Sequence, residues 1–77
     1  MVKSTDIGAA IRARRIKEEV TLEEMAALTG VGINTLSRLE RGVGNTQLNV
    51  LLKVLDTLGL ELSLLPRRTM YQEPATR

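Results

Sequence analysis

Two short helices joined by a tight turn occupy residues 21–42, and they constrain the fold more than any other feature of the sequence. The stretch TLEEMAALTGVGINTLSRLERG begins with Thr21 and Glu24 at capping-box spacing, in which hydroxyl and carboxylate each bind a free backbone N–H. Gly30 suits the left-handed residue that ends the first of these helices, and Gly42 suits the end of the second. Helices this short are marginal in water, so they must pack on other elements.

A further helix is expected on each side of this pair. The first begins at Ser4 or Thr5, where a hydroxyl can accept from a first-turn N–H, and runs to about Glu18. The last is capped by Asn45 or Thr46. Its leucines lie at helical spacing and predict a wide apolar stripe, formed by Leu48, Leu51, Leu52, Leu55 and Leu58.

The segment GLELSLLP, residues 59–66, alternates like a half-buried strand. A solitary strand leaves its backbone N–H and C=O groups without partners. We expect it to pair antiparallel with its copy in a second chain. The alternative is an extended arm that folds back on the helices of its own chain. The strand residues are Leu60, Glu61, Leu62, Ser63, Leu64 and Leu65.

Chain length sets the scale of the fold. With 77 residues there is room for one domain with a modest core, which favours oligomerisation. We therefore expect an all-α domain of four helices over residues 1–66, with a short C-terminal strand that pairs across a dimer. The sequence of residues 67–77 has no periodicity and predicts a flexible tail.

The composition excludes several classes of function. The chain has no cysteine and no histidine, so it lacks thiolate ligands and both the commonest general base and the commonest metal ligand. We expect no catalysis, no metal and no cofactor. No apolar run reaches the roughly 20 residues of a membrane span, and the first residues lack the apolar segment of a signal peptide, so a cytoplasmic location without membrane contact is expected.

Charge and aromatic content bear on nucleic-acid binding. The first 17 residues carry five cations and one anion, so any nucleic-acid surface must be one-sided. Arg12, Arg14 and Lys17 are expected as exposed cations of the first helix, either near DNA or simply solvated. One tyrosine with neither Phe nor Trp gives no platform for stacking single-stranded bases, so duplex DNA is the expected nucleic acid.

The helix pair of residues 21–42 has the spacing of a helix-turn-helix, which sets its second helix into the DNA major groove. In that second helix, Leu36 and Leu39 face inward. A solvated helix face is the alternative to a DNA-reading face. The outward residues are polar and partly basic: Asn34, Ser37, Arg38 and Arg41.

Two stretches carry a family resemblance. Residues 21–42 resemble the helix-turn-helix of the phage-repressor-like (Cro/cI, or XRE) family, with matching flanking helices over residues 5 to about 58. NTQLNVLLKVLDTLGLELSLLP, residues 45–66, resembles the end of the HipB antitoxins, where the last helix runs into a strand. That resemblance implies an intersubunit sheet in a homodimer.

The resemblance also implies roles for individual residues. Arg38 suits guanine O6 and N7, and Asn34 suits adenine N6 and N7. Leu22 stands where the family usually has a phosphate-gripping glutamine, and Gly32 where a Ser or Thr usually caps the recognition helix. The implied base readers are Ile33, Asn34, Ser37 and Arg38, and the implied phosphate contacts are Thr21, Leu22, Thr35 and Arg41.

A pair of opposite charges is expected inside the domain. Arg15 follows Ile7 and Ile11 at four-residue spacing, so it continues the inward stripe of the first helix. Glu40 follows Leu36 at the same spacing on the recognition helix. Two inward charges require each other, and the resembled family also places a buried Arg–Glu pair here.

The resemblance implies a homodimeric repressor that binds a palindromic operator in double-stranded DNA at its own promoter. It further implies the antitoxin of a HipBA-like module whose partner is a HipA-like serine/threonine kinase toxin. Two alternatives stay open. One is a stand-alone phage-type repressor without a toxin, and the other is a protein-interaction module that binds no DNA and recruits a partner by strand addition.

Overall fold

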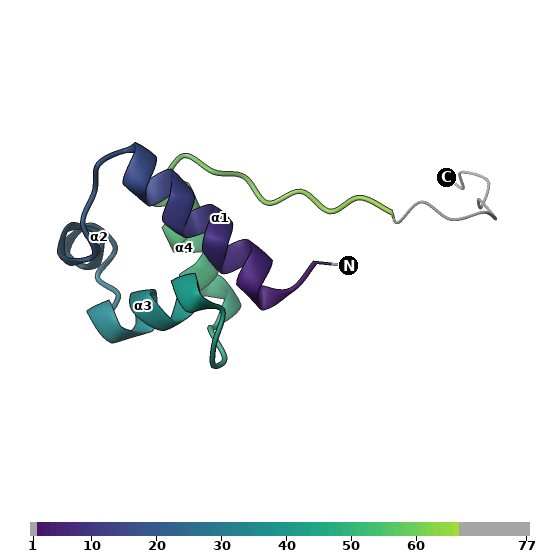
Figure 1. Cartoon of the computed structure of the whole chain (residues 1–77), viewed down its shortest axis with the longest axis horizontal. Helices are drawn as coiled ribbons and strands as arrows, with labels where there is room; N and C mark the ends of the chain where they lie inside the picture. The colour runs from purple at the N-terminus through teal and green to yellow at the C-terminus, as the bar shows by residue number, and fades with distance from the viewer. Residues whose placement is uncertain (1, 67–77) are drawn as a thin grey trace.

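The computed structural model describes residues 2–66 and contains four helices, which confirms the all-α prediction. The four helices form one body, and the chain after the last helix runs away from it (Figure 1). Met1 and the predicted flexible tail, residues 67–77, lie outside the described residues. The helices are α1 Ser4–Lys17, α2 Leu22–Thr29, α3 Ile33–Arg41 and α4 Leu48–Thr57.

Local chemistry fixes the ends of α2 and α3 as the sequence predicts. The Glu24 N–H donates to Thr21 Oγ1 at 3.0 Å, and the Thr21 N–H donates to Glu24 Oε1 at 2.8 Å. Gly30 ends α2 with a φ of 74°, and Gly42 ends α3 with a φ of 73°. Both angles lie in the left-handed region, where glycine alone carries no Cβ penalty.

The predicted caps of α1 and α4 are wrong. At α1 the residue before the helix is Lys3, and its N–H donates to the Asp6 carboxylate at 2.9 Å. A carboxylate in the first turn, rather than the expected hydroxyl, is therefore the side chain that accepts at this helix end. At α4 the residue before the helix is Gln47, and no side chain among those described caps it. Asn45 and Thr46 lie too early because the chain stays extended through Gln47.

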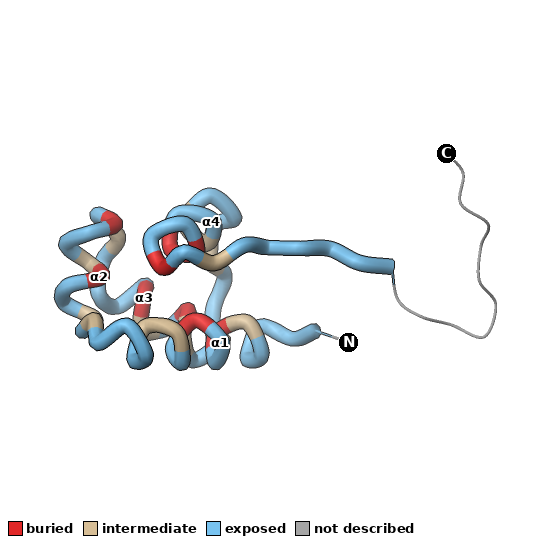
Figure 2. Tube along the Cα trace, turned by 90° about the horizontal axis from the view of Figure 1, so that it is seen from above, coloured by how far each residue is buried: buried red, intermediate tan, exposed pale blue. Residues whose placement is uncertain are grey.

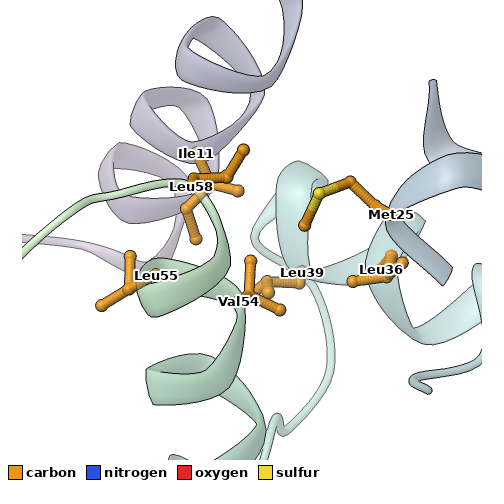
Figure 3. Close-up of a cluster of buried hydrophobic side chains, with 7 residues drawn as sticks. All are labelled: Ile11, Met25, Leu36, Leu39, Val54, Leu55 and Leu58. Carbon is orange, nitrogen blue, oxygen red and sulfur yellow. The ribbon is translucent and has the colours of Figure 1, made fainter. Parts of the chain in front are cut away.

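The core draws on all four helices (Figure 3). Val54 is fully buried, although the predicted α4 stripe omits it. Leu48 and Leu52 belong to that stripe, yet they are 65% and 45% exposed. The inward face of α4 is rotated by part of a turn from the predicted one, because Val54 rather than Leu52 meets the other helices. The core residues are Ile11, Met25, Leu36, Leu39, Val54, Leu55 and Leu58.

Two glycines let α1 and α3 approach backbone to backbone. A Cβ added to Gly8 would lie 2.5 Å from the Glu40 carbonyl oxygen. A Cβ added to Gly42 would lie 2.6 Å from Thr5 Cα. Neither neighbour can move without shifting a helix, so these glycines set the C-terminal half of α3 directly on α1.

Residues 61–66, here called the leucine arm, leave the helices as an extended chain whose residues are all exposed (Figure 2). Leu60 still packs against the core, but Leu64 and Leu65 are 85% and 84% exposed. Within residues 2–66 no strand forms, so the predicted strand is absent from the single chain, which offers no second strand to pair with. The arm also does not fold back on its own helices, and its pairing across a dimer stays a prediction.

Candidate nucleic-acid interface

The outer face of α3 carries the polar side chains that the sequence assigns to DNA. Leu36 and Leu39 are buried beneath it, so the helix turns its apolar side inward and its polar side outward as predicted. Ile33 is 38% exposed and leaves part of its hydrocarbon accessible. The remaining candidates on α3 are exposed except for a half-buried Ser37: Asn34, Thr35, Ser37, Arg38 and Arg41.

A buried threonine fixes the turn between α2 and α3. Thr29 is 1% exposed, and its Oγ1 donates to the Met25 carbonyl at 2.7 Å while accepting from the Val31 N–H at 3.1 Å. This one hydroxyl therefore bonds both to the last turn of α2 and to the approach to α3. The sequence analysis did not select Thr29, and a threonine directly before the helix-ending Gly30 is the signal that could have found it.

Arg15 and Glu40 form the expected pair and hold α3 against α1. Arg15 Nε lies 2.6 Å from Glu40 Oε2, and Arg15 Nη2 lies 3.0 Å from Glu40 Oε1. Arg15 Nη1 also donates to the Val20 carbonyl at 2.8 Å, which extends the clamp to the α1–α2 loop. The two side chains are only 12% and 7% exposed, so the pair is shielded from water.

Arg15 keeps its charge in this clamp at neutral pH. The hydrogen bond to Glu40 raises the pKa of Arg15 above its ordinary value, against the opposing effect of burial. Because the pKa of Arg15 is raised, the stabilisation it contributes is fully present at neutral pH and is lost only when the pH rises through that raised pKa. The contribution of Arg15 to the position of α3 is therefore insensitive to pH in the neutral range.

The N-terminal end of α2 offers backbone amides to a phosphate, with an opposing charge beside them. Leu22 is half-buried against the core, so its backbone N–H rather than its side chain is available there. Thr21 is exposed, but its backbone N–H already donates to Glu24, so its hydroxyl, which accepts from the Glu24 N–H, is the group that can donate to a phosphate. Glu23 and Glu24 place negative charge in the same turn, which weakens the attraction of this helix end for an anion.

Arg14 has a structural role that the sequence analysis did not assign. Its Nε donates to the Leu58 carbonyl at 3.0 Å, and its Nη2 lies 3.4 Å from Glu18 Oε2. A cation at the C-terminal end of α4 satisfies a carbonyl that the helix leaves free. Arg14 therefore ties α1 to the base of the leucine arm, and it is not the freely exposed cation that was expected.

Two further features, a membrane-spanning helix and a metal-holding cluster, are absent from the described residues. None of the helices in the described part of the chain is long and apolar enough to span a bilayer. Across residues 2–66 no three acidic, histidine or cysteine side chains lie close enough together to hold a metal ion.

The arrangement of α2, the turn and α3 agrees with a family of known proteins. The model of the family described as "Helix-turn-helix" matches residues 11–65. The chain belongs to this helix-turn-helix family. It is a transcriptional regulator with a DNA-binding fold, and the family is a class of DNA-binding proteins rather than of enzymes.

Two curated relatives of this helix-turn-helix regulator carry similar names. It is 37% identical over 60 residues to the uncharacterized HTH-type transcriptional regulator y4mF of Sinorhizobium fredii, covering 78% of this chain and 79% of y4mF. It is 39% identical over 67 residues to the uncharacterized HTH-type transcriptional regulator Mb0023 of Mycobacterium bovis. That match takes in 87% of this chain but only 26% of Mb0023.

Two solved structures share the fold of the helix-turn-helix regulator. ClgR, the clp gene regulator from C. glutamicum, superposes with a TM-score of 0.72 and 34% identity over 80% of each chain. HipB in the HipA–HipB–O2–O3 complex superposes with a TM-score of 0.79 and 26% identity. This second match covers 88% of the present chain and 96% of HipB.

Proposed function

We propose that this regulator is the autoregulatory antitoxin of a HipBA-like module, which as a homodimer represses its own promoter at a palindromic operator. The observation that carries the proposal is that the similarity takes in 96% of HipB, not the helix-turn-helix alone. HipB itself is found in a complex with HipA, O2 and O3. By analogy, the partner of this chain is a HipA-like serine/threonine kinase.

In the proposed complex the outer face of α3 reads bases in the major groove. Arg38 binds guanine and Asn34 binds adenine, each with two hydrogen bonds, while the exposed hydrocarbon of Ile33 contacts a thymine methyl. Ser37 stands one turn beyond Ile33 on the same face. Phosphates are bound by the backbone N–H of Leu22 and by the side chains of Thr21, Thr35 and Arg41.

In the proposed dimer the leucine arm pairs antiparallel with its copy. The support is that Leu62, Leu64 and Leu65 are exposed in the single chain while the backbone beside them lacks partners among the described residues. Leu48 and Leu52 add exposed apolar surface on α4 that a second copy can cover. A two-fold dimer then presents its two α3 helices about one duplex turn apart, roughly 34 Å.

A second candidate function has its own support. ClgR is a clp gene regulator and is more identical in sequence to this chain than HipB is, at 34% against 26%. A stand-alone repressor without a toxin would use the same α3 and the same dimer. The two candidates therefore differ in the protein partner and not in the DNA-reading face.

The deciding experiment is to express a tagged copy at native level in its own host and to identify what co-purifies after nuclease treatment. A serine/threonine kinase in equal amount, identified by mass spectrometry, supports the antitoxin. Recovery of the homodimer alone, still able to bind its upstream DNA, supports the stand-alone repressor.

Salt dependence separates both candidates from a protein-interaction module. If α3 binds DNA, the logarithm of the binding constant falls linearly with the logarithm of salt, with a slope of about −0.9 per phosphate neutralised. A shallow response that is equal for all DNA sequences would contradict DNA reading by α3. The protein-interaction module would then be the remaining function.

A further inference from the structure

The α3–α4 loop reaches the base-reading face at Gly44. A Cβ added to Gly44 would lie 2.9 Å from Nη2, 3.3 Å from Nε and 3.4 Å from Cζ of Arg38. All three nearest atoms belong to one guanidinium group. The charged end of Arg38 therefore rests against the bare backbone of Gly44, in space that any side chain would fill.

The backbone of this loop is anchored to Arg38. The Val43 N–H donates to the Arg38 carbonyl at 3.0 Å, which closes the end of α3, and Gly44 then turns the chain with a φ of 76°. Arg38 therefore contacts the loop twice: its backbone carbonyl holds Val43, and its guanidinium lies against Gly44. A shallow hollow beside them is lined by Thr35, Arg38, Val43, Asn45 and Thr46.

A fixed guanidinium matters for reading a base. Arg38 is exposed, and among residues 2–66 no acceptor takes a hydrogen bond from its guanidinium, which leaves its N–H donors available to a ligand as far as the described residues go. A long side chain in water samples many rotamers, and ordering it on binding lowers affinity and selectivity. Contact with the loop restricts those rotamers before DNA arrives.

We propose that Gly44 is a positioning residue for Arg38 and thereby sets selectivity at the base pair that Arg38 reads. The inference rests on the proposed base-reading role of Arg38. The missing side chain at position 44 creates the place that the guanidinium occupies. Any Cβ at this position pushes the guanidinium off the loop and returns it to a mobile state.

A matched control separates lost space from backbone strain. Gly59 has a φ of 70°, close to that of Gly44, so alanine suffers similar strain at either position. At Gly59, however, the nearest atom to an added Cβ is Arg14 Nη2 at 3.6 Å, an ordinary contact that does not involve Arg38. Gly59→Ala thus reports strain alone, while Gly44→Ala reports strain and the displacement of Arg38.

The test uses the full chain as wild type, Gly44→Ala, Gly59→Ala, Arg38→Ala and the double variant Gly44→Ala with Arg38→Ala. Selectivity is the ratio of affinities for an operator selected by the wild type and for the same operator changed at one base pair. We expect Arg38→Ala to lower this ratio at least about fivefold at one base pair. Gly44→Ala should lower the selectivity ratio at least about threefold at the same base pair, whereas Gly59→Ala should leave the ratio unchanged. The double variant should have the same ratio as Arg38→Ala, because the two residues act through one contact.

A second readout needs no DNA. In the NMR spectrum of the free wild-type protein, cross-relaxation should connect the Gly44 α protons with the Arg38 δ protons. In Gly59→Ala that signal should remain, and its absence from the wild type would overturn the inference. If Gly44→Ala fails to fold, Gly44→Asn replaces it, because asparagine tolerates the left-handed region and still adds a Cβ.

The outcomes distinguish this inference from the proposed function. If Arg38→Ala keeps full selectivity, Arg38 reads no base, and both the role and the inference fall. If Arg38→Ala loses selectivity but Gly44→Ala behaves as Gly59→Ala does, the base-reading role stands and the inference is overturned. Additive losses in the double variant also overturn it, because Gly44 would then act independently of Arg38.

Discussion

In the helical body, residues 4–60, a core of apolar side chains from all four helices is buried, whereas the leucine arm exposes its leucines. Val54 at the centre of the body is 0% exposed, while Leu64 in the arm is 85% exposed. The capping box of α2 and the Arg15–Glu40 clamp also find their hydrogen-bond partners inside the body. The difference teaches that the contacts within one chain hold α3 in place, whereas the arm makes no such contacts and is left exposed for the dimer proposed above.

The largest expected effect comes from breaking the clamp in the body. Glu40→Ala leaves the Arg15 charge shielded and without its carboxylate, which should lower the free energy of unfolding by about 3 kcal/mol. Urea unfolding followed by circular dichroism measures this. The control is Glu61→Ala, an exposed glutamate in the arm, which should change stability by less than about 0.5 kcal/mol. A loss below about 1 kcal/mol for Glu40→Ala would mean that water replaces the missing carboxylate.

The next effect tests the arm without touching the body. Leu62→Glu places a charge on the apolar face of the proposed intersubunit sheet and should raise the dimer dissociation constant about 100-fold, near 2.7 kcal/mol. Helix content should stay unchanged. The matched control is Leu28→Glu, an exposed leucine on α2 that is 65% exposed, and it should leave the dimer intact. Sedimentation equilibrium at micromolar concentration checks both, and an unchanged mass for Leu62→Glu would rule out the shared sheet.

A smaller effect is expected at the start of α2. Thr21→Ala removes the hydroxyl that accepts from the Glu24 N–H and should lower the free energy of unfolding by about 1 kcal/mol while the dimer mass stays the same. Thr57→Ala is the control, because the Thr57 hydroxyl only donates to the Lys53 carbonyl on an exposed face. Thermal unfolding compares the two. Equal decreases in the free energy of unfolding for the two variants would show that the capping box does not stabilise the body more than an ordinary exposed hydroxyl does.

The smallest expected effect is a gain. Glu19 has a φ of 58°, the left-handed region that costs a residue with a Cβ about 1–2 kcal/mol. Part of that cost is offset by the greater entropy that glycine loses on folding, so Glu19→Gly should stabilise the body by about 0.5 kcal/mol. Glu18→Gly, at a φ of −84°, should instead destabilise it. Unfolding in urea measures both variants. If Glu19→Gly and Glu18→Gly unfold at the same urea concentration, this account of the α1–α2 turn is contradicted.

The sequence predicts the parts of this fold that depend on neighbours along the chain. The Thr21–Glu24 capping box and the glycines that end α2 and α3 follow from chemistry within a few residues. The Arg15–Glu40 pair follows from four-residue spacing, because an inward charge must find an opposite one. The outward face of α3 follows from the same periodicity.

Features that depend on how whole helices meet were not predictable. The exposure of Leu48 and Leu52 follows from which side of α4 meets the core, and a run rich in leucine does not reveal that side. Arg14 bonding to the Leu58 carbonyl joins residues 44 positions apart, beyond the reach of any periodicity argument. The contact of Arg38 with Gly44 likewise depends on the path of the α3–α4 loop.

Selection of binding sites from a random pool of duplex DNA tests the central claim most directly. A dimer with one α3 helix per half-site should enrich a palindrome whose half-sites are centred about 10 base pairs apart. The same selection with Leu62→Glu should enrich single half-sites or nothing. A wild-type pool that stays random, or that converges on a sequence without two-fold symmetry, would contradict reading by α3 in a dimer joined through the leucine arm.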